Sequence, residues 1–315
     1  MRKALSVFTA LLLAGLSACG GGGGGGSSPS PYTGLTTPAV ITSSNADDIA
    51  RQSFQGGDLG ANALLSPARY GDVRPGGERP LTLTLVRLLS GAAAGVLPAS
   101  SPRAAEPQAI VPIDNTEFDG MGGSVRYMLS VNDQTGAFTG RIVFTNFHGD
   151  GGGVINGSVP VSGVVDSTDY IEIRFNFQSV RVVDGTTDVT AKGTVDLTAG
   201  TGGGQATLNL YFTDNGTGKT VWLSNYTVAV TDLAGATDVR TFGRIYLHDY
   251  GYVDVWTEAP FIYPTLSTQP SSGAITLTGS NNCRARLTVV DAATYTVELD
   301  ADGTGSYEWS VTHSW

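Results

Sequence analysis

From about residue 118 to the C-terminus, apolar and polar residues alternate in short runs separated by turn residues. Val125, Tyr127 and Leu129 show the pattern, which resumes at Phe138 after the turn residues 133–136. A period of two places successive side chains on opposite faces of a strand, so this stretch predicts a β-hairpin. Similar runs, each predicted as a strand, are 154–165, 170–183, 188–198, 205–213, 220–231, 239–248, 252–258, 273–278, 284–290, 294–299 and 306–315.

Short turns connect many of these predicted strands. Asp184-Gly185, Asp214-Asn215-Gly216, Asp249-Tyr250-Gly251 and Asp302-Gly303 all suit tight reversals. No parallel crossover is needed, so the strands form a long antiparallel meander. Because each strand has one apolar face to bury, we expect this all-β meander over residues 118–315 to form a barrel or a sandwich.

The segment 35–117 has a different composition and is expected to be helical or irregular and to pack on the sheet. Ser44 to Asp47 resembles a helix N-terminus and Gly56-Gly57 a stop, which predicts a helix over 45–55. Residues 80–90 fit both a strand and a helix, and Pro80 favours a second helix. The sequence thus predicts one or two short N-terminal helices, with a Pro- and Ala-rich loop over 91–112. The apolar face expected for the first helix is Ala46, Ile49, Ala50 and Phe54.

The first residues form an export signal. Met1 to Lys3 is basic and Ala4 to Leu16 is apolar, a stretch too short for a permanent membrane helix. Leu16-Ser17-Ala18-Cys19 resembles the lipobox of bacterial lipoproteins. The resemblance implies removal of residues 1–18, lipid on Cys19, and attachment to the cell envelope, at the outer membrane. Residues 19–34, rich in Gly, Ser and Pro, are expected to be a flexible tether.

The charge balance and the cysteines limit the partners further. The formal net charge is −10 and only 15% of residues are charged, so the chain repels phosphate backbones and nucleic acid is not expected as a partner. The membrane is expected as a partner through the lipid on Cys19. Cys283 then has no intramolecular partner for a disulfide and is predicted to be a small residue at or near a strand.

No familiar catalytic motif is present, so we do not expect an enzyme or a cofactor. The histidines are His148, His248 and His313, and a cryptic envelope hydrolase assembled in three dimensions remains an alternative. His148 and Asp150 share a glycine-rich loop, but two ligands do not make a metal site. If the hairpin turns at 133–136, its ladder brings Met121 near His148, which suits a structural role.

A second acidic segment superficially resembles a calcium loop. Asp300, Asp302 and Glu308 provide carboxylates, but the spacing lacks the third acidic position and the glycine of an EF-hand. We therefore predict a hairpin turn without a metal ion.

The segment 244–256 is the best-defined candidate binding surface. With a loop at 249–251, Leu247 faces Val253 and Ile245 faces Val255 on the core side. On the other side the predicted pairs are His248 with Tyr252, Tyr246 with Asp254, and Arg244 with Trp256, the last a candidate cation–π pair. The mixture of rings and charges is typical of surfaces that bind proteins or glycans, and ordinary cross-strand pairing is the alternative.

The terminal run 307–315 alternates and ends on Trp315, similar to the last strand of bacterial outer-membrane barrels. An integral barrel is therefore an alternative. The layout as a whole resembles β-rich bacterial envelope lipoproteins. The function expected from the sequence is binding or scaffolding by a lipid-anchored domain.

Overall fold

A computed structural model describes residues 32–64, 110–132, 134–148, 153–165, 170–185, 187–265, 267 and 269–315, and the side chains of its helix as far as Gly56. Residues Tyr32–Trp315 form one compact unit. The predicted signal sequence, Cys19, the predicted second helix over 80–90 and Asp150 lie outside the described residues.

The described elements are one α-helix, a short 3-10 turn and fourteen strands. They are α1 (Ala46–Leu64), β1 (Ile110–Phe118), β2 (Ser124–Asn132), β3 (Ala137–His148), β4 (Val154–Val165), β5 (Ile171–Asp184), β6 (Thr187–Gly200), β7 (Gly203–Asp214), β8 (Thr220–Leu233), β9 (Ala236–Leu247), β10 (Gly251–Pro264), β11 (Ser272–Thr278), η2 (Ser280–Asn282), β12 (Arg284–Val289), β13 (Thr294–Asp300) and β14 (Trp309–Ser314).

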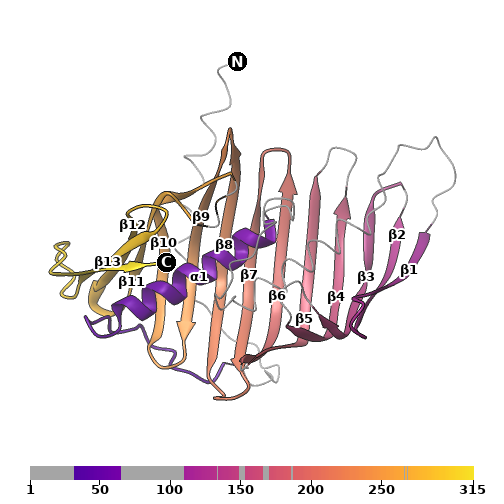
Figure 1. Cartoon of the computed structure of the whole chain (residues 1–315), viewed down its shortest axis with the longest axis horizontal. Helices are drawn as coiled ribbons and strands as arrows, with labels where there is room; N and C mark the ends of the chain where they lie inside the picture. Colours follow the sequence, from indigo (N-terminus) through magenta and orange to yellow (C-terminus); the bar gives the residue numbers. More distant parts are fainter. Residues whose placement is uncertain are drawn as a thin grey trace, which may run out of the picture. The chain divides into compact units, whose positions relative to one another are not determined.

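All fourteen strands belong to one antiparallel sheet in which they follow their sequence order. Figure 1 shows the strands from β1 to β9 side by side in that order. The predicted all-β meander is therefore confirmed. The sheet is open, because among the described strands β1 pairs only with β2 and β14 only with β13. The expectation of a closed barrel or a sandwich is thus replaced by a single open sheet.

Helix α1 explains how part of this open sheet buries its apolar side. The helix lies across one face and contacts β7, β8, β9, β12 and β13 (Figure 1). The helix covers the apolar face of these strands, so no second sheet has to pack on that face. We call the face that α1 contacts the inner face and the opposite one the outer face.

The predicted apolar side of α1 is correct, but its predicted end is not. Ala46, Ile49, Ala50 and Phe54 are all buried. The helix continues past Gly56 to Leu64. A Cβ atom at Gly56 would lie 3.3 Å from Leu223 Cδ2, so this glycine allows the helix to approach β8 closely.

Strand β1 occupies residues that were expected to be irregular. Nearly all of its residues are exposed, and it lies at an edge of the sheet. An edge strand without a buried face has no need for alternation, so the sequence pattern gave no signal there.

Candidate functional site

The β9–β10 hairpin separates its two faces as the alternation predicted. Ile245, Leu247, Val253 and Val255 are all buried on the inner face. The predicted cross-strand pairs are wrong, because Leu247 faces Gly251 and Tyr246 faces Tyr252. This register differs from the predicted one by two positions, a shift that keeps every side chain on its face.

Gly251 accounts for the difference in register. It begins β10 with a positive φ of 95° and was expected to lie in the loop. A Cβ atom there would lie 2.2 Å from the carbonyl oxygen of Thr37, which approaches from the N-terminal segment. Only glycine suits this position, and the three-residue loop therefore consists of 248–250.

Four aromatic rings form a row across the outer face. They are Tyr211 on β7, Trp222 on β8, Tyr246 on β9 and Tyr252 on β10. The Trp222 and Tyr246 centroids are 4.2 Å apart with nearly parallel planes, and those of Tyr211 and Trp222 are 5.1 Å apart. Because neighbouring rings cover each other's faces, these side chains contribute mainly to packing, and sugar rings have little face on which to stack.

Tyr32 packs against this row from the N-terminal segment. Its ring lies 5.5 Å from that of Tyr246 and 6.0 Å from that of Trp222. Burial raises the pKa of Tyr32 to about 12, with Tyr246 and Asp249 contributing. The first residue of the folded unit is thus a fixed part of the outer face.

Arg244 is held by Asp254 and Tyr252, and the predicted cation–π contact with Trp256 is not formed. Its guanidinium donates to both carboxylate oxygens of Asp254 at 2.7 and 3.0 Å. The same group lies 3.8 Å from the centroid of the Tyr252 ring. The hydrogen bond to Asp254 raises the pKa of Arg244, although burial opposes the shift.

Trp256 presents a large exposed aromatic surface on the outer face. It is 58% exposed and lies beside Phe242, which is 37% exposed, with 6.3 Å between ring centroids. No pattern in the sequence pointed to Phe242. Its contact with Trp256 depends on how β9 and β10 pair, and their register is irregular at this point.

A second charged cluster lies two strands away on β12. Arg286 donates to Glu298 at 2.8 Å, lies 3.6 Å from Glu258, and stacks 4.4 Å over the Tyr307 ring. We call Phe242, Trp256, Glu258, Arg286 and Tyr307 the Trp256 patch. The alternation along β10 and β12 could have placed Glu258 and Arg286 on the outer face. Their contact with each other depends on the β10–β11 and β11–β12 registers, which the alternation does not determine.

His248 does not lie with the other predicted surface residues. It is in the loop between β9 and β10, and its Nδ1 accepts the backbone N–H of Thr220 at 3.3 Å. It lines a groove on the inner side of the sheet. The predicted pairing of His248 with Tyr252 is therefore wrong.

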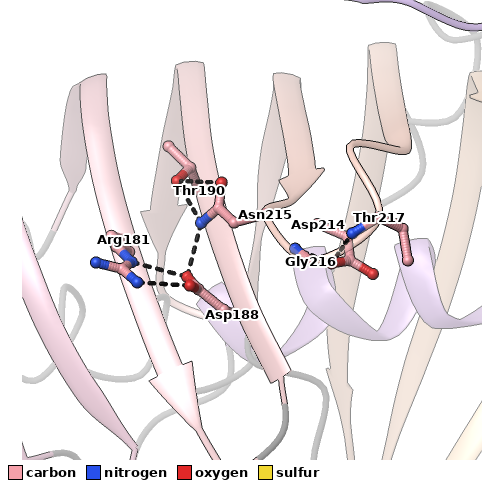
Figure 2. Close-up of polar contacts among 7 residues, drawn as sticks. All are labelled: Arg181, Asp188, Thr190, Asp214, Asn215, Gly216 and Thr217. Atoms are coloured by element: carbon pink, nitrogen blue, oxygen red, sulfur yellow. Dashed lines mark hydrogen bonds and ion pairs between the residues drawn. The ribbon is translucent and has the colours of Figure 1, made fainter.

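A polar cluster near the same end of the sheet has a structural role (Figure 2). Asp188 accepts hydrogen bonds from Arg181 and from Asn215, the latter at 2.6 Å. The bond from Arg181 is the main reason that the pKa of Asp188 is lowered to about 2. Asp214 accepts the backbone N–H groups of Gly216 and Thr217. These bonds fix the β7–β8 turn beside the β5–β6 hairpin.

His148 pairs with Asp119, and Asp150 lies outside the described residues. The predicted β2–β3 register, which placed Met121 opposite His148, is the one observed along the strands. Asp119 accepts from the backbone N–H and lies 2.7 Å from Nδ1 of His148, and it also accepts the N–H groups of Met121 and Gly123. Burial alone would raise the pKa of Asp119, but these hydrogen bonds hold it well below its usual range. The carboxylate closes the end of the hairpin.

Asp300, Asp302 and Glu308 bring their carboxylate oxygens within 4.8 Å of one another. Asp300 accepts backbone N–H groups of Thr304 and Gly305, and Glu308 accepts that of Ala301. These bonds are those of a closed turn, and the absence of a calcium requirement stays a prediction.

Cys283, His313 and Trp315 all contact residues of the N-terminal part of the fold. Cys283 is buried, with its Sγ 3.8 Å from the carbonyl oxygen of Ala39. On β14, His313 Nε2 lies 3.3 Å from Asp47 Oδ1 of α1. Trp315 packs its ring 4.9 Å from that of Phe54. The terminal strand thus holds the helix.

Comparison with known proteins gives no family. No family model, curated protein or solved structure matches the chain. In the part of the chain that the structure describes, no helix is both long and apolar enough to cross a membrane.

Proposed function

We propose that this protein is a lipid-anchored component of the bacterial cell envelope, at the outer membrane, that binds a protein partner through the Trp256 patch. Lipid on Cys19 would hold it to the membrane, as the Leu16 to Cys19 sequence suggests. The role is binding or scaffolding and not catalysis.

Hydrogen bonds join the N-terminal segment to the sheet, as suits a domain held to a membrane through its N-terminal end. The N–H of Leu35 donates to the carbonyl oxygen of His248. Pro38 forms a parallel bridge with Tyr252, in which the Ala39 N–H donates to the Tyr252 carbonyl at 2.8 Å and the Tyr252 N–H donates to the Thr37 carbonyl at 2.9 Å. Thr33 donates its backbone N–H to Thr220 Oγ1 at 3.1 Å. A pull on the preceding residues would therefore be transmitted to β8 and β10.

The exposed Trp256 beside Phe242 is the observation that carries the binding proposal. Tryptophan, tyrosine and arginine dominate the energetics of protein interfaces. Here Trp256 of β10 and Arg286 of β12 lie on either side of Thr276 of β11, and the Tyr307 ring, between β13 and β14, stacks on Arg286. Arg286 is already oriented by Glu298 and Glu258, so little side-chain entropy is lost when a partner binds. Outside the patch, the faces of Tyr246 and Tyr252 are covered, so the neighbouring outer face offers sugar rings little surface for stacking.

The attachment is tested by metabolic labelling with a fatty-acid analogue. Wild-type protein should be labelled and recovered with outer membranes, whereas Cys19→Ser should lose both properties. Equal labelling of the two proteins would refute the anchor.

The binding surface is tested by photo-crosslinking in intact cells. A photoreactive amino acid at position 256 should give a discrete cross-linked species that Arg286→Ala weakens. The matched control is position 233, since Leu233 is 45% exposed at the far end of β8. The same products from both positions, or none from position 256, would contradict the proposal.

The alternatives from the sequence are less well supported. An integral barrel requires a closed sheet, whereas this sheet has two edge strands among its described residues. A hydrolase requires a histidine, a carboxylate and a nucleophile in one site. His248 and Thr220 share a groove with carboxylates, but Thr220 is buried and its hydroxyl oxygen accepts the backbone N–H of Thr33. His148 contacts an Asp119 carboxylate that already accepts several backbone N–H groups. Both arrangements favour structural roles.

A further inference from the structure

A groove of about 420 Å³ lies at one end of the sheet, between α1 and the loops that follow β7 and β9. This volume is within the range of small-molecule sites. It is lined by side chains of α1, of β6 to β9 and of the loops after β7 and β9.

The floor of the groove is apolar and incompletely covered. Val189, Phe212 and Val221 are only half-buried, and they pack against the main hydrophobic core. Leu247 beside them is buried. An apolar ligand body placed on this floor would remove further apolar surface from water.

The rim of the groove carries an excess of negative charge. Asp48, Asp214 and Asp249 line it, and Lys219 is the single lysine or arginine among the lining residues. Lys219 pairs with Asp249. That hydrogen bond raises the pKa of the Lys219 ammonium, and the charges of Asp214 and Asp48 act in the same direction. Arg51, next to the lining residues on α1, pairs with Asp48 at 3.1 Å. The three carboxylates therefore face two cations, and the rim keeps an excess of one negative charge.

Hydrogen bonds hold two of these carboxylates in place. Asp48 accepts from the Tyr250 hydroxyl and from Gln52, both at 2.9 Å. Asp214 accepts two backbone N–H groups through Oδ1. The negative rim is thus preorganised before any ligand binds.

We propose that this groove binds a small organic cation, an amine whose apolar body rests on Val189, Phe212 and Val221 and whose ammonium lies among the rim carboxylates. The ligand ammonium competes with Lys219 for Asp249. An anion of the same shape meets like charge at the rim and is excluded. The site lies on the inner side of the sheet and does not use the Trp256 patch.

The test compares three probes of similar shape against the full mature protein by ligand-observed NMR. They are 2-phenylethylamine, the neutral 2-phenylethanol and the anionic 3-phenylpropanoate. We expect the amine to bind with a dissociation constant of about 1 mM or below, the alcohol more weakly, and the carboxylate not at all.

Two variants move the affinity in opposite directions. Asp249→Asn removes a rim charge and should weaken amine binding by about two- to fivefold, whereas Lys219→Met removes the internal competitor and should strengthen it by about as much. Both side chains are about half exposed, so the fold should be retained. Asp254→Asn is the matched control, because Asp254 is an ion-paired carboxylate on the outer face and should leave the affinity unchanged.

The proposal is overturned if no probe binds at millimolar concentration, or if the carboxylate binds as well as the amine. It is also overturned if Asp249→Asn and Lys219→Met shift the affinity in the same direction. Failure of cross-linking at position 256 would leave this result unaffected, so the two proposals fail separately.

Discussion

Replacing Leu247 with alanine tests whether the two faces of the β9–β10 hairpin differ in burial. Leu247 is 1% exposed on the inner face. Truncating a buried leucine costs about 2.7 to 5 kcal/mol, depending on how well the surrounding atoms close the cavity. Because Leu247 borders the groove, water can enter the space left behind. We therefore expect a loss near the lower end, about 3 kcal/mol of unfolding free energy.

Trp256→Ala is the comparison on the outer face. With 58% of the residue exposed, about two fifths of its surface is covered. For a side chain of roughly 250 Å² this is on the order of 100 Å², or at most about 2.5 kcal/mol at 25 cal/mol per Å². Residual burial in the unfolded chain lowers the expected loss to about 1.5 kcal/mol or less.

Urea unfolding of the chain from residue 19 onward, carrying Cys19→Ser so that the proposed lipid cannot be attached, measures both losses against the same parent. The order of the two values matters more than their sizes, because both variants share the same hairpin. A Trp256→Ala loss equal to or greater than that of Leu247→Ala would show that the outer face is buried, and it would remove the basis for the Trp256 patch.

Three further results are expected. Tyr32→Ala should speed hydrogen exchange at the amides of Leu35 and Ala39, which hold the N-terminal segment to the sheet, and should leave exchange in β12 and β13 unchanged. Equal effects throughout the sheet would contradict a local role for Tyr32. Thermal melts with calcium and with a chelator should coincide, whereas a calcium-induced rise that Asp302→Ala abolishes would reveal a metal site. Asp119 has a lowered pKa in the fold, so its contribution is present above the ordinary carboxyl pKa and is lost as the pH falls. Asp119→Asn should therefore destabilise the protein at pH 7, with a difference from the parent that shrinks below about pH 4, and a difference that is constant with pH would argue against this.

The sequence by itself determined the local structure and which side of each element is buried. Alternation identified the strands from β2 onward, and helical spacing identified Ala46, Ile49, Ala50 and Phe54 as the buried side of α1. It also placed Arg244 and Trp256 on one side of the hairpin and Leu247 on the other. These properties follow from the periods of strand and helix, which depend only on residues close in sequence.

Only the tertiary structure decided which residues meet. The contact of Thr37 with Gly251 set the hairpin register and placed Arg244 over Tyr252 instead of Trp256. The packing of α1 on β7 to β9 and on β12 and β13 also depends on segments that are distant in sequence. The same is true of the sheet, which stays open. So does the groove, whose rim combines Asp48 of α1 with Asp214 and Asp249 of separate turns. Local periodicity carries no information about such contacts, because they are selected by the packing of the whole chain.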